Sequence, residues 1–245
     1  MTDLNFLAET LLSLLAGVPR TLQLAIISVT AGAILAVLLA STRLYGPRPA
    51  RLLVRGYVFA FRGTPLLVQM FLIYYGLGQL PSVRHSFLWA YLREPFWCAI
   101  LALTLNTAAY GAELVRGGIL SVPYGQIEAA RACGMSSLMT FRRITFPVAL
   151  RQVLPAYGNE IILMIKSTSL ASIITLMEVT GIAYKLISQT YNAIPVFVCA
   201  GAIYLLINFI VTRLMQRLER RLTPHLRERS EFTGAEGTGK RVSMN

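Results

Sequence analysis

The stretch EAARACGMSSLMTFRRITFPVALRQVLP, residues 128–155, differs in composition from most of the chain around it. It contains four arginines and one glutamate among many small residues, whereas most of the chain is strongly apolar. Strong helix formers come first, and Gly134 then interrupts the run. Apolar residues follow at intervals of three, at Met135, Leu138 and Phe141. The pattern predicts two short helices joined by a turn at the glycine.

The composition of the whole chain indicates an integral membrane protein. Of its 245 residues, 55% are hydrophobic and only 14% are charged, and the mean hydropathy is +0.59. So few polar side chains cannot cover the surface of a soluble globule. The net charge of +12 would suggest nucleic-acid binding in a soluble protein, but in a membrane protein it indicates an excess of Lys and Arg in the cytoplasm. We therefore expect membrane lipid around the chain and no nucleic-acid partner.

Five segments are long and apolar enough to cross a bilayer, which requires about 20 largely apolar residues per helix. They cover approximately residues 21–42, 57–80, 96–115, 148–176 and 194–211. The sequence therefore predicts an all-α membrane domain over residues 21–218 with about five transmembrane helices. A segment of residues 1–20 precedes this domain, and a basic tail of residues 219–245 follows it. The tail is rich in glycine and charge, so we expect it to be disordered.

The distribution of Lys and Arg predicts the orientation of these spans. Four arginines lie in residues 43–55, five in residues 116–151, and eight Lys or Arg from residue 213 onward. The connections on the other side carry only Arg20, Arg84, Arg93 and Lys185. Because cytoplasmic loops carry the excess of cations, the N-terminus is predicted to lie outside and the C-terminus in the cytoplasm. The opening stretch then belongs to a cytoplasmic loop over about residues 117–147.

Three blocks of sequence carry a resemblance to a known family. They are FRGTPLLVQ at residues 61–69, LNTAAYGAELVRGGILSVPYGQIEAARACGM at residues 105–135 and YGNEIILMIKSTSLAS at residues 157–172. In this order and spacing they resemble the permease subunits of ATP-binding-cassette importers, particularly the histidine-, octopine- and nopaline-type permeases for polar amino acids. The resemblance covers about residues 15–220. It implies a type I importer permease, a multi-pass protein of the bacterial inner membrane.

In that family the loop that contains the EAA sequence supplies a coupling helix, which docks on the ATP-hydrolysing subunit. The resemblance assigns this role to Glu128, Ala129, Ala130 and Gly134. The alanines would allow close approach, the glutamate would fix the register, and the glycine would make the turn. The alternative interpretation of the same residues is an amphipathic loop on the membrane surface, with its arginines toward anionic lipid.

The resemblance also implies the other components of a transporter. Two copies of an ATP-binding subunit would bind and hydrolyse ATP, so the chain itself would need no cofactor and no catalytic residues. A second, paralogous permease subunit would complete the path as a heterodimer, and an extracytoplasmic binding protein would deliver the substrate. The implied substrate is a polar, often basic amino acid or an opine, of the class of histidine, arginine, lysine, ornithine, octopine and nopaline.

Little in the sequence supports the two alternatives, a membrane-embedded enzyme and an ion-coupled secondary transporter. The tail segment GAEGTGKR, residues 234–241, meets the GxxxxGK part of a phosphate-binding loop but has Arg where Ser or Thr should hold magnesium. Three separated cysteines, with two histidines outside the spans, predict neither a metal site nor an embedded hydrolase. A secondary transporter would show more spans and an internal repeat. We therefore expect a non-catalytic subunit.

Charged residues inside the predicted spans are candidates for function because a charge in the bilayer is costly. They are Arg62, Glu113, Glu160 and Lys166. With nearby polar residues, three of these charges form the candidate lining of a substrate path: Arg62, Thr64, Gln69, Asn106, Asn159, Glu160 and Lys166. Pro65 would break its helix and free carbonyl groups to face this path. Glu160 would bind the cationic group of the substrate, and the alternative is a structural ion pair between Glu160 and Arg62.

Overall fold

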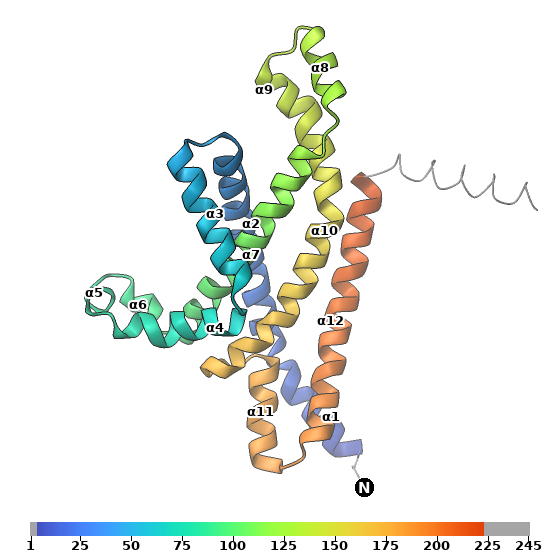
Figure 1. Ribbon diagram of the computed structural model, residues 1–245. Helices are drawn as coiled ribbons and strands as arrows, with labels where there is room; N and C mark the ends of the chain where they lie inside the picture. Colours follow the sequence, from blue (N-terminus) through green and yellow to red (C-terminus); the bar gives the residue numbers. More distant parts are fainter. Residues whose placement is uncertain (1–3, 223–245) are drawn as a thin grey trace, which may run out of the picture.

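The computed structural model describes residues 4–222, and all regular structure in this range is helical (Figure 1). The predicted all-α class is confirmed. Three helical segments are long and apolar enough to cross a membrane, and the number rises to five if each of two bent helix pairs counts as one span. The five predicted spans thus correspond to the upper count. The tail segment 234–241 and its expected disorder lie outside the described residues.

The centre of the molecule is a close contact between α2 (Val18–Tyr45) and α7 (Pro95–Leu120). Small residues make this contact possible, since a Cβ atom on Gly32 would lie only 2.8 Å from the side chain of Thr107. Contacts of this kind, with small residues between close backbones, are characteristic of helices packed inside membranes. The pair forms the scaffold on which the other helices are arranged.

The second predicted span is not one helix. α3 (Arg48–Gly63) ends just before Pro65, and the chain continues as α4 (Leu66–Phe71) after a bend of 108°. Pro65 has no N–H for a helical hydrogen bond, and it disfavours the helical conformation at Thr64, which is extended at φ −116° and ψ 145°. The predicted break at Pro65 is therefore present. The predicted span over residues 57–80 is therefore interrupted by this bend, and its first helix begins at Arg48, earlier than predicted.

Short helical segments connect α4 to α7 and project to one side of the molecule (Figure 1). They are a π-helical turn at Leu72–Gly76, a 3₁₀ turn at Leu77–Gln79, α5 (Pro81–Arg84) and α6 (Trp89–Leu92). The Arg84 guanidinium carbon lies 5.8 Å from the centre of the Trp89 ring. This cation–π contact holds α5 against α6.

α10 (Phe146–Ser167) corresponds to the fourth predicted span and packs against α7. A π-helical turn at Phe141–Thr145 leads into it. A 3₁₀ segment at Thr168–Ile174 follows, after which the chain bends by 46° into α11 (Val179–Thr190). The helix pair is therefore a bent unit, and the part after the bend was not included in the predicted span of residues 148–176.

α12 (Ala193–Leu222) contains the fifth predicted span and extends beyond it. α1 (Leu4–Leu15) packs against α11 and α12 at the end of the molecule that holds the N-terminus (Figure 1). Together α1 and α2 form an apolar helical segment of 42 residues, so helix begins well before the predicted first span at residue 21. Large apolar side chains remain exposed along α12, as at Leu205 with 73% exposure. Such a surface suits contact with lipid or with another membrane subunit.

α8 (Tyr124–Ala132) and α9 (Ser137–Thr140) form the end of the molecule beyond α7 and α10 (Figure 1). Gly134 joins them at φ +78°, a left-handed conformation that favours glycine. The Ser136 hydroxyl oxygen caps α9 by accepting a hydrogen bond from the Met139 N–H at 3.3 Å. The prediction of two short helices joined at Gly134 is confirmed.

Candidate functional site

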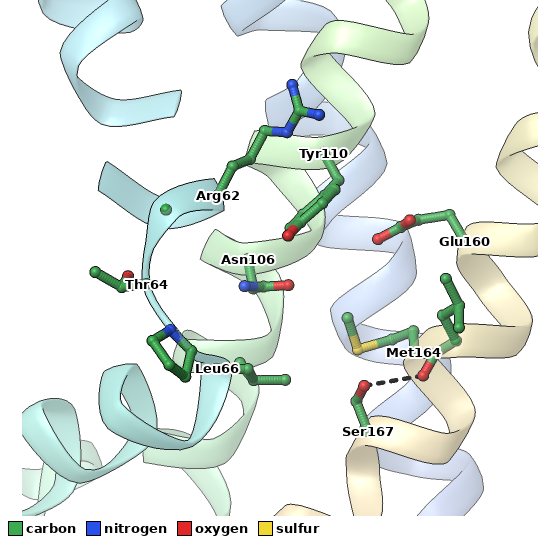
Figure 2. Close-up of a pocket in the computed structure, with 11 residues that line it drawn as sticks. Arg62, Thr64, Leu66, Asn106, Tyr110, Glu160, Met164 and Ser167 are labelled. Carbon is green, nitrogen blue, oxygen red and sulfur yellow. Dashed lines mark hydrogen bonds between the residues drawn. The ribbon is translucent and has the colours of Figure 1, made fainter. Parts of the chain in front are cut away.

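The break between α3 and α4 opens onto a cavity of about 480 Å³ that also faces α7 and α10. Four of the residues predicted for a substrate path line this cavity: Arg62, Thr64, Asn106 and Glu160. Figure 2 shows Arg62 from the end of α3, Asn106 and Tyr110 from α7, and Glu160 from α10 arranged around it. One guanidinium, one carboxylate and one amide therefore reach a single space from three helices.

Arg62 and Glu160 share the cavity without forming an ion pair. The Arg62 guanidinium carbon lies 5.2 Å from the centre of the Tyr110 ring, which is within the range of a cation–π contact. Within residues 4–222, the Glu160 carboxylate has neither a hydrogen bond nor an ion pair. The structural Arg62–Glu160 pair is therefore not formed in this structure, and both charged groups are available to a ligand.

Gln69 does not line the cavity but stabilises the break beside it. Its side chain is buried, and Nε2 donates hydrogen bonds to the carbonyl oxygens of Phe61 and Thr64 at 2.8 and 3.0 Å. In an unbroken helix the Phe61 carbonyl would accept from residue 65, but Pro65 has no N–H to donate. Gln69 Oε1 in turn accepts a hydrogen bond from Asn106 Nδ2 at 3.0 Å. Gln69 thus satisfies carbonyl groups that the proline frees, and it links α4 to α7.

Asn159 and Lys166, which were also predicted for the path, are exposed and do not line the cavity. The α10 residues that do line it follow helical spacing: Glu160, Leu163, Met164 and Ser167. Asn159 and Lys166 fall between these positions on the helix. The structure therefore brings together four of the seven predicted path residues, places Gln69 behind them, and leaves two elsewhere.

Helical spacing would also have found two lining residues that were not predicted from the sequence. Tyr110 lies one turn after Asn106 on α7, and Ser167 lies two turns after Glu160 on α10. The Ser167 hydroxyl donates to the Leu163 carbonyl oxygen at 2.9 Å, as the dashed line in Figure 2 marks. Tyr110 and Ser167 could therefore have been predicted from the sequence by applying helical periodicity to Asn106 and Glu160.

Glu113, another charge inside a predicted span, is paired. Its carboxylate forms ion pairs with Arg43 of α2 and with Arg116 of α7, the latter at 3.0 Å between Oε2 and Nη2. Two guanidinium groups therefore offset the cost of removing this carboxylate from water. Glu113 joins α2 to α7 and is not available to a ligand in the way that Glu160 is.

Glu178 is a fully buried carboxylate that was not predicted from the sequence. Oε1 accepts a hydrogen bond from the Gly181 N–H at 2.8 Å, and Oε2 accepts from the Thr180 N–H at 3.0 Å and the Tyr204 hydroxyl at 2.6 Å. The Thr21 hydroxyl also donates to Oε2, at 3.5 Å. Glu178 therefore caps α11 and ties it to α12 and α2. It follows the predicted fourth span by two residues and so was not counted among the charges inside the spans.

The proposed coupling residues lie on two faces of the loop that holds α8. Glu128, Ala129 and Gly134 are exposed, whereas Ala130 is buried. The carboxylate of Glu128 and the small side chain of Ala129 thus belong to the free surface at this end of the molecule. Ala130 instead belongs to the interior face of α8, where a small side chain permits close packing.

The sequence matches a known protein family over most of its length. Residues 28–224 match the family described as binding-protein-dependent transport system inner membrane component. The chain belongs to this family. The matched range includes every residue that lines the cavity and both helices around Gly134. The resemblance drawn from the three sequence blocks is therefore confirmed.

Named relatives are similar over nearly the whole chain. Identity is 60% over 230 residues with the octopine transport system permease protein OccM of Rhizobium meliloti, covering 92% of each chain. It is 57% over 228 residues with the nopaline transport system permease protein NocM of Agrobacterium fabrum strain C58, covering 93% of this chain and 95% of that one. A solved structure described as a crystal structure of an amino acid ABC transporter with histidines matches at a TM-score of 0.80 and 33% identity, over 90% of this chain and 99% of that one. The named relatives are permease subunits, which are the non-catalytic part of such transporters.

Proposed function

We propose that the chain is a permease subunit of an ATP-driven importer for amino acids or opines, and that the cavity at the α3–α4 break forms part of its substrate path. The observation that carries the proposal is a cavity in which Arg62 and Glu160 face one space without neutralising each other. Family membership and relatives named for octopine and nopaline support a polar, amino-acid-like substrate.

The cavity complements the groups of an amino acid. A guanidinium binds a carboxylate through paired, charge-assisted hydrogen bonds, so Arg62 suits the substrate α-carboxylate. Glu160 suits a cationic group, and the Asn106 side chain adds a neutral polar contact. Because a transport path must bind its cargo weakly enough to release it, two separate charges suit it better than a closed, tightly binding pocket.

The two helices around Gly134 are the proposed docking surface for the ATP-binding subunit, present in two copies. α7 leads into α8, and α9 leads through the π-helical turn into α10, so the loop is continuous with two walls of the cavity. Movement of the docked loop would therefore reach the substrate path directly. A second, paralogous permease subunit would complete the path, and an extracytoplasmic binding protein would deliver the substrate. In this scheme ATP is bound and hydrolysed by the partner, and the chain itself holds no cofactor.

The proposed orientation has the N-terminus outside and the C-terminus in the cytoplasm. The α2–α3 connection, the loop with α8 and α9, and the described end of α12 all lie toward the same end of the molecule (Figure 1). These are the three regions that carry the excess of Lys and Arg. Their grouping supports a multi-pass protein of the bacterial inner membrane with this end in the cytoplasm.

Glu160→Gln tests the proposal in vesicles that contain the assembled transporter. Uptake of arginine should fall about tenfold, since a hydrogen bond to a charged group contributes about 1.5–3 kcal/mol. Uptake of a neutral amino acid such as glutamine should fall less. The melting temperature of the complex in detergent should not change, because no described residue loses a hydrogen bond or ion pair to Glu160.

The matched control is Glu94→Gln, the same chemical change at an exposed carboxylate outside the cavity. This variant should retain the uptake of both amino acids. Equal losses for arginine and glutamine in Glu160→Gln, together with a lower melting temperature, would contradict the proposal and assign Glu160 a structural role.

A further inference from the structure

α10 carries a second group of polar side chains, which does not face the cavity. Gln152, Asn159 and Lys166 are exposed, and each follows the one before by seven residues. Because seven residues make about two helical turns, the three side chains lie on one stripe of the helix, together with the exposed Ala156. The polar stripe, as we call these four residues, adjoins the cavity at Leu163, which is exposed and also lines it.

Lys166 lies at the depth of the apolar span of α12. α10 packs against α12, and a Cβ atom on Gly158 would lie 3.6 Å from the Met215 side chain. Seven residues further along α10, Ile165 is buried in one cluster with Ile207. The two helices are therefore antiparallel, and Lys166 is level with the interior of the apolar span of α12 and not with its end.

The exposed faces of α10 and α12 differ in composition at this depth. Over residues 194–211, every exposed residue of α12 is apolar: Ile194, Phe197, Val198, Gly201, Ala202, Leu205, Leu206, Phe209 and Ile210. Lipid hydrocarbon can cover this face without leaving a polar side chain unsatisfied. The polar stripe is unsuited to hydrocarbon, because a charged side chain inside a bilayer is costly. The polar stripe therefore faces protein or water.

The chain itself supplies no partner for the polar stripe. Within residues 4–222, the Lys166 ammonium group forms no ion pair, and the Gln152 and Asn159 side chains form no hydrogen bond. The nearest carboxylate on α10 is that of Glu160, which lines the cavity. A molecule that covers the polar stripe should therefore offer one carboxylate and groups that bond to amides.

We propose that the polar stripe is a contact face for the second permease subunit, and that Lys166 forms an ion pair there with a carboxylate of that subunit. This inference rests on the proposed function, because it requires a second permease subunit. The polar stripe adjoins Leu163, so a subunit seated on it also forms a wall of the cavity. The contact thus places the second subunit beside the proposed substrate path.

A second copy of this chain fits the polar stripe less well than a different permease does. Two copies related by a two-fold axis along the membrane normal meet at equal depth, so their Lys166 ammonium groups would face and repel each other. The Glu160 carboxylate is roughly 9 Å away along the helix and belongs to the cavity. A paralogous subunit with Asp or Glu at the depth of Lys166 supplies the missing charge.

A photoreactive side chain at Ala156 tests the contact in the purified transporter, assembled with the second permease subunit and the ATP-binding subunit. p-Benzoylphenylalanine in place of Ala156 should cross-link this chain to the second permease subunit, which mass spectrometry of the product identifies. Ala202, an exposed alanine on the apolar face of α12, is the matched control. The same photoreactive side chain at Ala202 should give lipid adducts and no cross-linked subunit.

The ion pair is tested by removing the charge. Lys166→Met should lower the amount of second permease subunit that co-purifies with this chain about tenfold, because the partner carboxylate is left without its cation. Lys166→Arg, which keeps the charge, should restore most of it. Lys185→Met removes an exposed lysine from α11, outside the polar stripe, and should leave co-purification unchanged.

Three results at Ala156 would overturn the contact: a product with a second copy of this chain, lipid adducts alone, or no adduct at all, as expected of a water-lined face. Equal co-purification of Lys166→Met and Lys185→Met would overturn the ion pair. If this chain and the ATP-binding subunit transport substrate without a second permease subunit, the proposed function itself fails. An active, complete transporter that cross-links through Ala202 and not through Ala156 refutes the inference alone.

Discussion

Glu160 and Glu178 are carboxylates near each other in the sequence, in opposite surroundings. Glu178 is fully buried and accepts hydrogen bonds from two backbone N–H groups and from the Tyr204 hydroxyl. Glu160 faces a cavity and has no such partner among the described residues. A carboxylate whose partners are all within the protein holds helices together, whereas one without partners is available to a ligand.

The cost of removing charge from water explains why both arrangements are stable. A buried carboxylate without partners would cost several kcal/mol. Glu178 avoids this cost because donors from α11, α12 and α2 surround it. Glu160 avoids it because its side chain lines an open cavity. The number of hydrogen-bond partners separates the two roles more clearly than position along a span does.

The largest effect on stability is expected at Glu178, whose carboxylate accepts several hydrogen bonds. Glu178→Ala leaves two backbone N–H groups and the Tyr204 hydroxyl without their acceptor, at a cost of about 1–3 kcal/mol for each buried group that finds no new partner. The melting temperature of the detergent-purified complex should fall by several degrees, and uptake of every substrate should fall equally. Glu178→Gln keeps one acceptor and should lose less. An unchanged melting temperature in Glu178→Ala would show that the hydrogen bonds of Glu178 do not stabilise the complex, and the contrast with Glu160 would then be wrong.

A smaller effect is expected at Gln69, which is structural like Glu178 but borders the cavity. Gln69→Leu keeps the volume and leaves the Phe61 carbonyl and the Asn106 amide without their partner, which should cost about 2 kcal/mol. Because Asn106 also lines the cavity, substrate uptake per assembled complex should fall along with the melting temperature. Gln79→Leu, at an exposed glutamine, is the matched control and should change neither. A loss of uptake without a lower melting temperature would instead assign Gln69 a role in substrate binding, like the one proposed for Glu160.

The smallest effect is expected where no buried polar group is involved. Gly134→Ala places a side chain at φ +78°, which should cost about 1–2 kcal/mol confined to the loop between α8 and α9. If the loop docks on the ATP-binding subunit as proposed, ATP hydrolysis should remain while substrate uptake per ATP falls about twofold, because the strained loop fits its docking site less well. Gly56→Ala, on α3 and outside the loop, has open space and no positive φ, so it serves as the control. If the two variants show the same substrate uptake per ATP, the left-handed conformation of the loop does not contribute to coupling.

Features set by local backbone chemistry or by hydrophobic length could be predicted from the sequence. Apolar length predicted an all-α membrane protein, and three sequence blocks predicted its family. The break at Pro65 and the turn at Gly134 were also predicted, because a missing N–H and a left-handed φ act within a few residues of their own position. The orientation and the partners of the coupling loop stay predictions.

The partners of the polar side chains were decided only by the tertiary structure. Gln69 bonds to Asn106 across 37 positions of sequence, and Thr21 reaches Glu178 across 157. For the same reason Arg62 lies over Tyr110 and not against Glu160, and Asn159 and Lys166 lie outside the cavity. The sequence by itself determined which polar groups enter the helices and that a helix breaks at Pro65 and the loop turns at Gly134. Which groups meet depends on how helices far apart in the chain pack, and no local pattern encodes those contacts.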